Sequence, residues 1–178
     1  AGQQLVDRGE QVFVATRPGL DDGKAGGGNG TPMQFTIRSL NSGFFAMAQQ
    51  LDLCDIKKVA TKLGVRVAST NEEVNMTTQF SILGSNNISP LAMAGAYATV
   101  ANKGIYCTPH AIDRVTDADG NDLPIPASTC EQVLDPKVAA TAAYAFRAVM
   151  TSGTGTGGNP GGKVPVIGKT GTHNKKQK

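Results

Sequence analysis

A short apolar run that ends in a cation and two hydroxyls is the feature that most restricts what this chain can form. Residues 164–167 (Val-Pro-Val-Ile) predict a short buried strand. The strand leads into Lys169, Thr170, Gly171 and Thr172. The lysine supplies positive charge, the threonine hydroxyls can donate to a carboxylate, and the glycine lets a ligand backbone approach closely. The end of this strand is therefore suited to an anionic peptide terminus, although Lys-Thr-Gly alone also fits a plain turn after a strand.

Two short polar residues near the start of the chain form a second candidate feature. Ser39 and Asn41 interrupt two stretches, 33–38 and 43–53, whose apolar residues recur at near-helical spacing. At such a break these side chains could simply cap a helix or turn the chain. However, Ser-x-Asn followed by Lys-Thr-Gly is the order that accompanies Ser-x-x-Lys in penicillin-binding proteins and class A β-lactamases.

With these motifs in order, the chain resembles the transpeptidase domain of class A (bifunctional) penicillin-binding proteins. Segments 84–98, 101–106 and 149–155 are also similar to family segments, so the resemblance extends from about residue 31 to residue 172. It implies an α+β fold of the penicillin-binding protein and β-lactamase type, with helices packed on an antiparallel sheet. The expected order of helices, a hairpin and a final strand agrees with the α+β class.

The nucleophile of that family has no counterpart in this sequence. It is the serine of Ser-x-x-Lys, and no serine here has a lysine three positions later. We therefore expect residues 1–178 to be a partial transpeptidase domain that lacks the Ser-x-x-Lys segment and the strands that follow Lys-Thr-Gly. The isolated chain is expected to be inactive.

The resemblance also implies a function. It is that of a serine-type DD-transpeptidase, which transfers an acyl group from a D-Ala-D-Ala stem peptide, cross-links peptidoglycan and binds β-lactams. By match to the motifs, Ser39, Asn41 and Lys169 would be catalytic. Thr170, Gly171 and Thr172 would bind substrate, and no metal or other cofactor is expected.

The implied partners are peptidoglycan stem peptides, β-lactam antibiotics and the remainder of the same polypeptide, with a glycosyltransferase domain upstream. The implied location is the extracytoplasmic face of the bacterial cell membrane, with the anchor outside this chain. No apolar run is long enough to cross a bilayer. The net charge of +3 argues neither for nor against nucleic acid. No basic stripe interleaves with aromatic residues and there is no tryptophan, so a nucleic-acid partner is not expected.

Two other functions stay open. One is a catalytically silent penicillin-binding-like module used for binding or scaffolding, which a Ser-x-x-Lys before Ala1 would argue against. The other is a serine β-lactamase, which would need a deacylating glutamate. The adjacent Glu72 and Glu73 lie on a polar stretch and are typical of solvated carboxylates.

Two of the three cysteines flank a predicted hairpin. Asp119-Gly120 is a hairpin turn signal, and a hairpin centred there brings Cys107 and Cys130 nearly opposite each other. We expect a disulfide in an oxidising compartment, with two buried thiols as the alternative. Cys54 is expected to pack as a small apolar residue, and no cysteine or histidine has zinc-ligand spacing.

The rest of the chain gives local signals. The glycine-rich segment 23–30 predicts a flexible loop. Ser89-Pro90 and Asp135-Pro136 each predict a helix start, because a capping side chain precedes a proline that tolerates the first turn. The expected strand and helices are 12–15 (strand), then 33–39, 42–53, 56–63, about 90–102 and about 136–151 (helices).

Overall fold

The structure is a computed structural model that describes residues 4–7, 10–15 and 28–172. The helices are α1 (Pro32–Arg38), α2 (Asn41–Ala48), α3 (Leu53–Lys62), α4 (Pro90–Ala101) and α5 (Pro136–Ser152), with short 3-10 turns η1 (Gln79–Leu83) and η2 (Thr156–Gly158). The strands are β1 (Gln4–Asp7), β2 (Glu10–Ala15), β3 (Gly28–Gly30), β4 (Ile105–Cys107), β5 (Val115–Thr116), β6 (Asp122–Leu123) and β7 (Cys130–Gln132). This mixture of helices and antiparallel strands is the expected α+β class.

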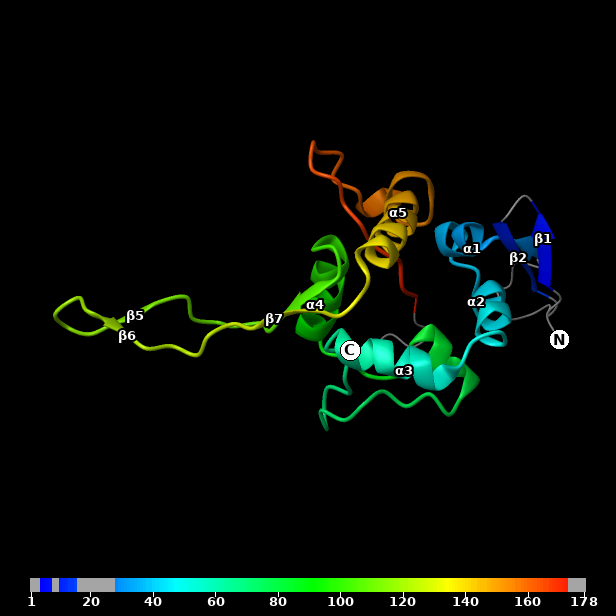
Figure 1. Ribbon diagram of the computed structural model, residues 1–178. Coiled ribbons are helices and arrows are strands. Elements are labelled where there is room, and N and C mark those ends of the chain that lie inside the picture. The colour runs from blue at the N-terminus through cyan, green and yellow to red at the C-terminus, as the bar shows by residue number, and fades with distance from the viewer. Residues whose placement is uncertain (1–3, 8–9, 16–27, 173–178) are drawn as a thin grey trace.

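A small antiparallel sheet, in the order β1-β2-β3, lies beside α1 and α2 (Figure 1). The predicted strand 12–15 falls within β2. The predicted loop 23–30 is wrong for its last three residues, because Gly28–Gly30 pairs with β2 and Gly30 lies opposite Phe13. The backbone groups along the edge of β2 pair with this segment. A glycine-rich composition does not reveal that a strand edge lies nearby. Residues 23–27 lie outside the described part of the chain.

The first helix is fixed by a capping box at its start. The Thr31 hydroxyl accepts from the Gln34 backbone N–H at 3.2 Å, and the Gln34 side chain accepts from the Thr31 N–H at 3.0 Å. Phe35 in this helix is 2% exposed and packs with Ala46 of α2. The two helices therefore form a compact unit with a sharp break between them, as the sequence predicts.

The second and third helices differ in length from the prediction. The expected helix 42–53 ends at Ala48, and the expected helix 56–63 begins earlier, at Leu53. The carboxylate of Asp52 accepts from the Cys54 N–H at 2.8 Å and so caps a new helix. The cap lies inside the expected helix 42–53, because apolar spacing alone does not reveal where a capping carboxylate starts a new helix.

Helices α4 and α5 form the centre of the molecule (Figure 1). Both begin as predicted, since the Ser89 hydroxyl accepts from the Ala92 N–H and the Asp135 carboxylate accepts from the Lys137 N–H. The rings of Tyr97 and Phe146 lie 5.3 Å apart between them. The most buried side chains of this region are Thr99, Ala139 and Val149.

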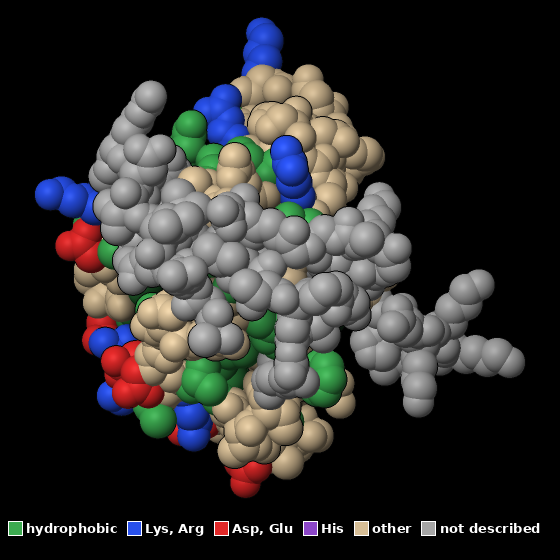
Figure 2. All heavy atoms as spheres, turned by 90° about the vertical axis from the view of Figure 1, so that its right-hand side faces the viewer, with side chains coloured by type: hydrophobic (Ala, Val, Ile, Leu, Met, Phe, Trp, Pro, Cys, Tyr) green, Lys and Arg blue, Asp and Glu red, His purple; other side chains and the backbone are tan. Residues whose placement is uncertain are grey.

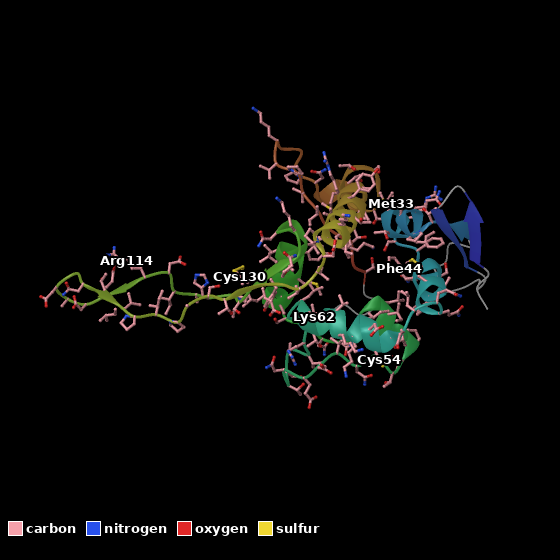
Figure 3. All side chains as sticks on the ribbon, viewed as in Figure 1. Met33, Phe44, Cys54, Lys62, Arg114 and Cys130 are labelled. Carbon is pink, nitrogen blue, oxygen red and sulfur yellow. A yellow bond between two sulfur atoms is a disulfide. The ribbon has the colours of Figure 1, made fainter. Side chains whose placement is uncertain are left out.

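A long hairpin arm extends from this centre (Figure 1). Strand β4 pairs with β7 at its base, and β5 pairs with β6 near its tip. The structure contains a disulfide between Cys107 and Cys130, which are directly opposite in the β4–β7 pair. Figure 3 shows Cys130 at the base of the arm and Arg114 far along it.

The expected strand at 164–167 is not formed. No strand is assigned between residues 159 and 172, and Val164 is 77% exposed. A strand needs a neighbouring ladder of backbone hydrogen bonds, and none of the described strands lies beside this segment. The segment is instead irregular, and its Gly168 lies against the end of α5. None of the described helices is long and apolar enough to cross a membrane.

Candidate active site

Ser39 occupies an unusual backbone position between α1 and α2. Its φ of 56° and ψ of 44° lie in the left-handed region, which residues with a side chain rarely adopt. This conformation ends α1, and the following Leu40 N–H returns to the Phe35 carbonyl at 3.0 Å. The serine is thereby held at a rigid corner, with Asn41 starting the next helix.

Lys169 reaches this corner from the other end of the chain. Its Nζ donates to Ser39 Oγ at 2.5 Å and to the Thr170 carbonyl oxygen at 3.2 Å. An ammonium group has only donors, so Ser39 must act as the acceptor in this contact, and its own hydroxyl proton is left for another group. The structure thus brings Ser39 and Lys169, both expected site residues, into direct contact.

The environment of Lys169 disfavours its charge. The side chain is half-buried, and desolvation lowers the pKa of Lys169 from its usual value of 10.5. The lysine at this position is therefore easier to deprotonate than a lysine on the surface.

Around this contact lies a cleft of about 300 Å³. All six expected site residues line it, from both ends of the sequence: Ser39, Asn41, Lys169, Thr170, Gly171 and Thr172. Phe44, Ile82 and Leu83 complete the wall, and the sequence did not single them out for this role. Apolar side chains on a helix and on a 3-10 turn give no signal that separates a cleft wall from a core.

A larger apolar hollow of about 600 Å³ adjoins the cleft and shares Phe44 and Ile82 with it. Figure 2 shows hydrophobic side chains gathered in the lower part of this face of the molecule. None of the described side chains that line the hollow is ionisable. Of the described side chains that line the two hollows, the ionisable one, Lys169, belongs to the smaller cleft.

The segment before Lys169 is held against the end of α5. The Gly168 N–H donates to the Phe146 carbonyl at 3.4 Å. The Met150 thioether fills the space beside Gly155 and Gly168, where a Cβ on either glycine would come within 3 Å of its sulfur. Two glycines thus allow the segment to lie close enough to α5 for Lys169 to reach Ser39.

The adjacent carboxylates Glu72 and Glu73 do not line the cleft. Glu73 pairs with Lys57 at 2.8 Å, and this ammonium lowers the pKa of the Glu73 carboxyl. The interpretation of these residues as solvated surface groups fits this exposed ion pair. Within residues 28–172 and the described parts of β1 and β2, no three His, Cys, Asp or Glu side chains are grouped as a metal site would require.

The fold and the cleft define a class of protein. Residues 18–178 match the penicillin-binding protein transpeptidase domain, so the chain belongs to this family. The resemblance inferred from the motifs is confirmed. The family is homologous to the DD-transpeptidases and acts in peptidoglycan synthesis.

Among curated proteins, the chain is similar to penicillin-binding protein 2a of Streptococcus pneumoniae, with 29% identity over 139 residues. It is also similar to penicillin-binding protein 1A of Neisseria gonorrhoeae, with 32% identity over 97 residues. These alignments cover 78% and 52% of this chain but only 18% and 12% of the relatives. The chain therefore spans less than a fifth of the length of either relative.

Solved structures show the same fold. The D,D-transpeptidase domain of a peptidoglycan glycosyltransferase from Eggerthella lenta matches with a TM-score of 0.69 and 21% identity, over 92% of this chain and 48% of that one. PBPA from Mycobacterium tuberculosis matches with a TM-score of 0.65 and 18% identity, over 81% and 37%. The expected penicillin-binding protein fold is thus confirmed for the part that this chain covers.

Proposed function

We propose that this chain forms one side of the active site of a peptidoglycan DD-transpeptidase. The observation that carries the proposal is the hydrogen bond from Lys169 Nζ to Ser39 Oγ in a cleft lined by both motifs. The reaction is acyl transfer from a D-Ala-D-Ala stem peptide to an amine of a neighbouring stem. The attacking serine belongs to a Ser-x-x-Lys segment outside these 178 residues.

The first step makes an acyl-enzyme. The serine oxygen bonds to the carbonyl carbon of the penultimate D-Ala and its proton passes to a base, while the C–N bond breaks and the terminal D-Ala leaves as an amine. That leaving nitrogen must receive a proton. Ser39 is suited to deliver it, because Lys169 occupies the Ser39 oxygen as a donor and leaves the hydroxyl proton available.

The lowered pKa of Lys169 supports the same role. A lysine with a depressed pKa passes a proton on to Ser39 more readily than an ordinary ammonium does. Asn41, at the start of α2 and on the same wall, would orient the substrate amide. In the second step the acceptor amine attacks the ester carbonyl, forms the new amide and releases the serine hydroxyl.

The other end of the cleft is suited to the substrate carboxylate. Thr170 and Thr172 offer hydroxyl donors beside the positive charge of Lys169. At Gly171 a built Cβ meets no described atom within 4 Å, so the backbone is open toward a ligand. The Thr172 N–H would serve as an oxyanion donor, and loss of one such donor in a related chemistry costs about 2.7–4 kcal/mol.

Two features support the wider setting of this proposal. Penicillin-binding protein 3 of Mycobacterium tuberculosis, which shares the fold, has been solved in complex with ampicillin, and PBPA as an imipenem acyl-enzyme. We extend β-lactam binding to this protein on that basis. The disulfide at the base of the arm suits an oxidising compartment, in agreement with the extracytoplasmic face of the membrane.

The test is acylation of the full-length protein by a fluorescent penicillin. Lys169→Ala should slow labelling on the order of a hundredfold, since a hydrogen bond to a charged group is worth about 1.5–3 kcal/mol. Lys163→Ala is the matched control, because Lys163 is an exposed lysine on the same segment and should not alter the rate. Residues 1–178 alone should not be labelled.

Other outcomes identify the other functions. Full-length protein that takes up no label would be a catalytically silent module. A label that first attaches to the protein and is then released by hydrolysis would indicate a β-lactamase. Labelling of a serine within residues 1–178 would contradict the proposed location of the nucleophile.

A further inference from the structure

Thr154 contacts both chain segments that meet in the cleft. Its backbone N–H donates to the Ile37 carbonyl oxygen at 3.1 Å, two residues before Ser39. Its hydroxyl oxygen lies 2.7 Å from the hydroxyl oxygen of Thr170, directly after Lys169. A single residue thus connects the Ser39 corner to the carboxylate end of the cleft.

The backbone around Thr154 is held on both sides. Before it, Gly153 lies so close to the Ile37 carbonyl oxygen that a Cβ would overlap that atom. After it, the Gly155 N–H donates to the Val149 carbonyl at 3.0 Å and ties the turn to the end of α5. The hydroxyl of Thr154 is therefore presented to Thr170 from a fixed main chain, although the residue itself is exposed.

We propose that Thr154 is a positioning residue that orients the Thr170 hydroxyl toward the substrate carboxylate. This inference rests on the proposed function. A hydroxyl group carries one proton and two acceptor lone pairs. When Thr154 donates to Thr170, the Thr170 proton is free to point into the cleft. In the opposite orientation Thr170 would present only lone pairs to a carboxylate and would repel it.

A second contact fixes the main chain of Thr170. Its carbonyl oxygen accepts from Lys169 Nζ at 3.2 Å, so the main chain of Thr170 is tied to the same ammonium that holds Ser39. With the main chain fixed, the side-chain hydroxyl remains free to rotate. The contact with Thr154 restricts this rotation. Carboxylate binding by Thr170 therefore depends on the glycine-rich turn that holds Thr154 in place.

The experiment compares two acyl donors on the full-length protein: a thioester analogue of the stem peptide with a free terminal carboxylate, and its methyl ester. In either case the serine ester forms, the C–S bond breaks and the thiol leaves with a proton. Thr154→Val keeps the shape and the backbone N–H but removes the hydroxyl. It should slow acylation by the free acid about three- to tenfold, the worth of one hydrogen bond, and leave the methyl ester unaffected.

Two further variants make the result specific. Thr154→Ser restores the hydroxyl and should return the rate for the free acid to within about twofold of wild type. Thr156→Val is the matched control, since Thr156 is an exposed threonine of the same turn whose hydroxyl has no hydrogen bond to any described residue. Thr154→Ala serves as a second hydroxyl-free variant if the valine does not fold.

The outcomes separate this inference from the proposed function. Equal slowing of both donors by Thr154→Val would show a merely structural role and overturn the inference, as would no slowing of either donor. Wild-type protein that reacts with neither donor would overturn the proposed function and the inference with it. Only selective loss with the free acid, restored by serine, supports the orienting role.

Discussion

The ammonium nitrogen of Lys169 lies 2.5 Å from the hydroxyl oxygen of Ser39, although 130 positions separate the two residues in the sequence. This contact joins the corner between α1 and α2 to the segment whose Gly168 lies against the end of α5. Both of its members are held by their own surroundings, Ser39 by a left-handed backbone and Lys169 by partial burial. The effect of the left-handed backbone at Ser39 and the effect of the burial of Lys169 can be measured separately.

Substitutions of Ser39 should separate the effect of the hydroxyl from that of the backbone. Both Ser39→Ala and Ser39→Gly remove the acceptor of Lys169, but only glycine adopts a φ of 56° at no steric cost. We expect the glycine variant to be more stable than the alanine variant by about 1 kcal/mol. Urea denaturation measures the difference, and acylation should be slowed equally in both. Equal stabilities would mean that the corner carries no strain.

The pH dependence of stability should report the burial of Lys169. Its pKa is lower in the folded state than in the unfolded chain, so between these two values the unfolded chain binds more protons. The free energy of unfolding contributed by this group therefore rises as pH increases from the folded pKa toward 10.5. Below the folded pKa the lysine is charged in both states, so its burial lowers the free energy of unfolding by an amount that no longer changes with pH.

The measurement is a series of urea midpoints from about pH 8 to pH 11, for wild type and Lys169→Met. Subtracting the two curves removes the contribution of every other titrating group. The wild type should gain stability relative to the methionine variant across this range. A difference that stays constant with pH would contradict the lowered pKa.

Gly171 should be needed for ligand approach and not for folding. Its φ is not positive and a Cβ meets no described atom within 4 Å, so Gly171→Ala should change the free energy of unfolding by less than about 0.5 kcal/mol. Its methyl group would occupy the open side of the cleft and slow acylation. Gly157→Ala is the control, with equally open surroundings outside the cleft, and should affect neither quantity. Normal acylation by Gly171→Ala would argue against a ligand at this backbone.

Reduction of the Cys107–Cys130 disulfide should destabilise the protein. The bond closes a loop with a sequence separation of 23 and restricts the unfolded chain. Its loss should lower the free energy of unfolding by roughly 3 kcal/mol. Denaturation with and without reductant measures this, and Cys54→Ser should leave the difference unchanged because Cys54 is not bonded. The double variant Cys107→Ser/Cys130→Ser should match the reduced protein.

The sequence predicts those elements whose signals are local. Helices α4 and α5 begin where Ser89-Pro90 and Asp135-Pro136 indicate, since cap and proline act within one turn. The sequence likewise predicts the break at Ser39. The boundary between α2 and α3 is predicted a few residues too late, because the Asp52 cap falls inside the apolar pattern of the expected helix 42–53.

Features that depend on a segment distant in the sequence cannot be predicted from local patterns. Gly28–Gly30 becomes a strand only because β2 lies beside it, and residues 164–167 do not become one because no described strand does. The association of Ser39 with Lys169 came from family resemblance and not from spacing. Thr154 was part of a recognised segment, but its contacts to Ile37 and Thr170 exist only in three dimensions.

The separation of Ser39 and Lys169 in the sequence also means that the two residues are synthesised at different times. At a synthesis rate of about 5–20 residues per second, Lys169 follows Ser39 after roughly 6 to 26 seconds. For that interval the Ser39 hydroxyl lacks the ammonium group that contacts it in the folded chain. The cleft lined by both segments therefore cannot assemble until residues 169–172 have been made.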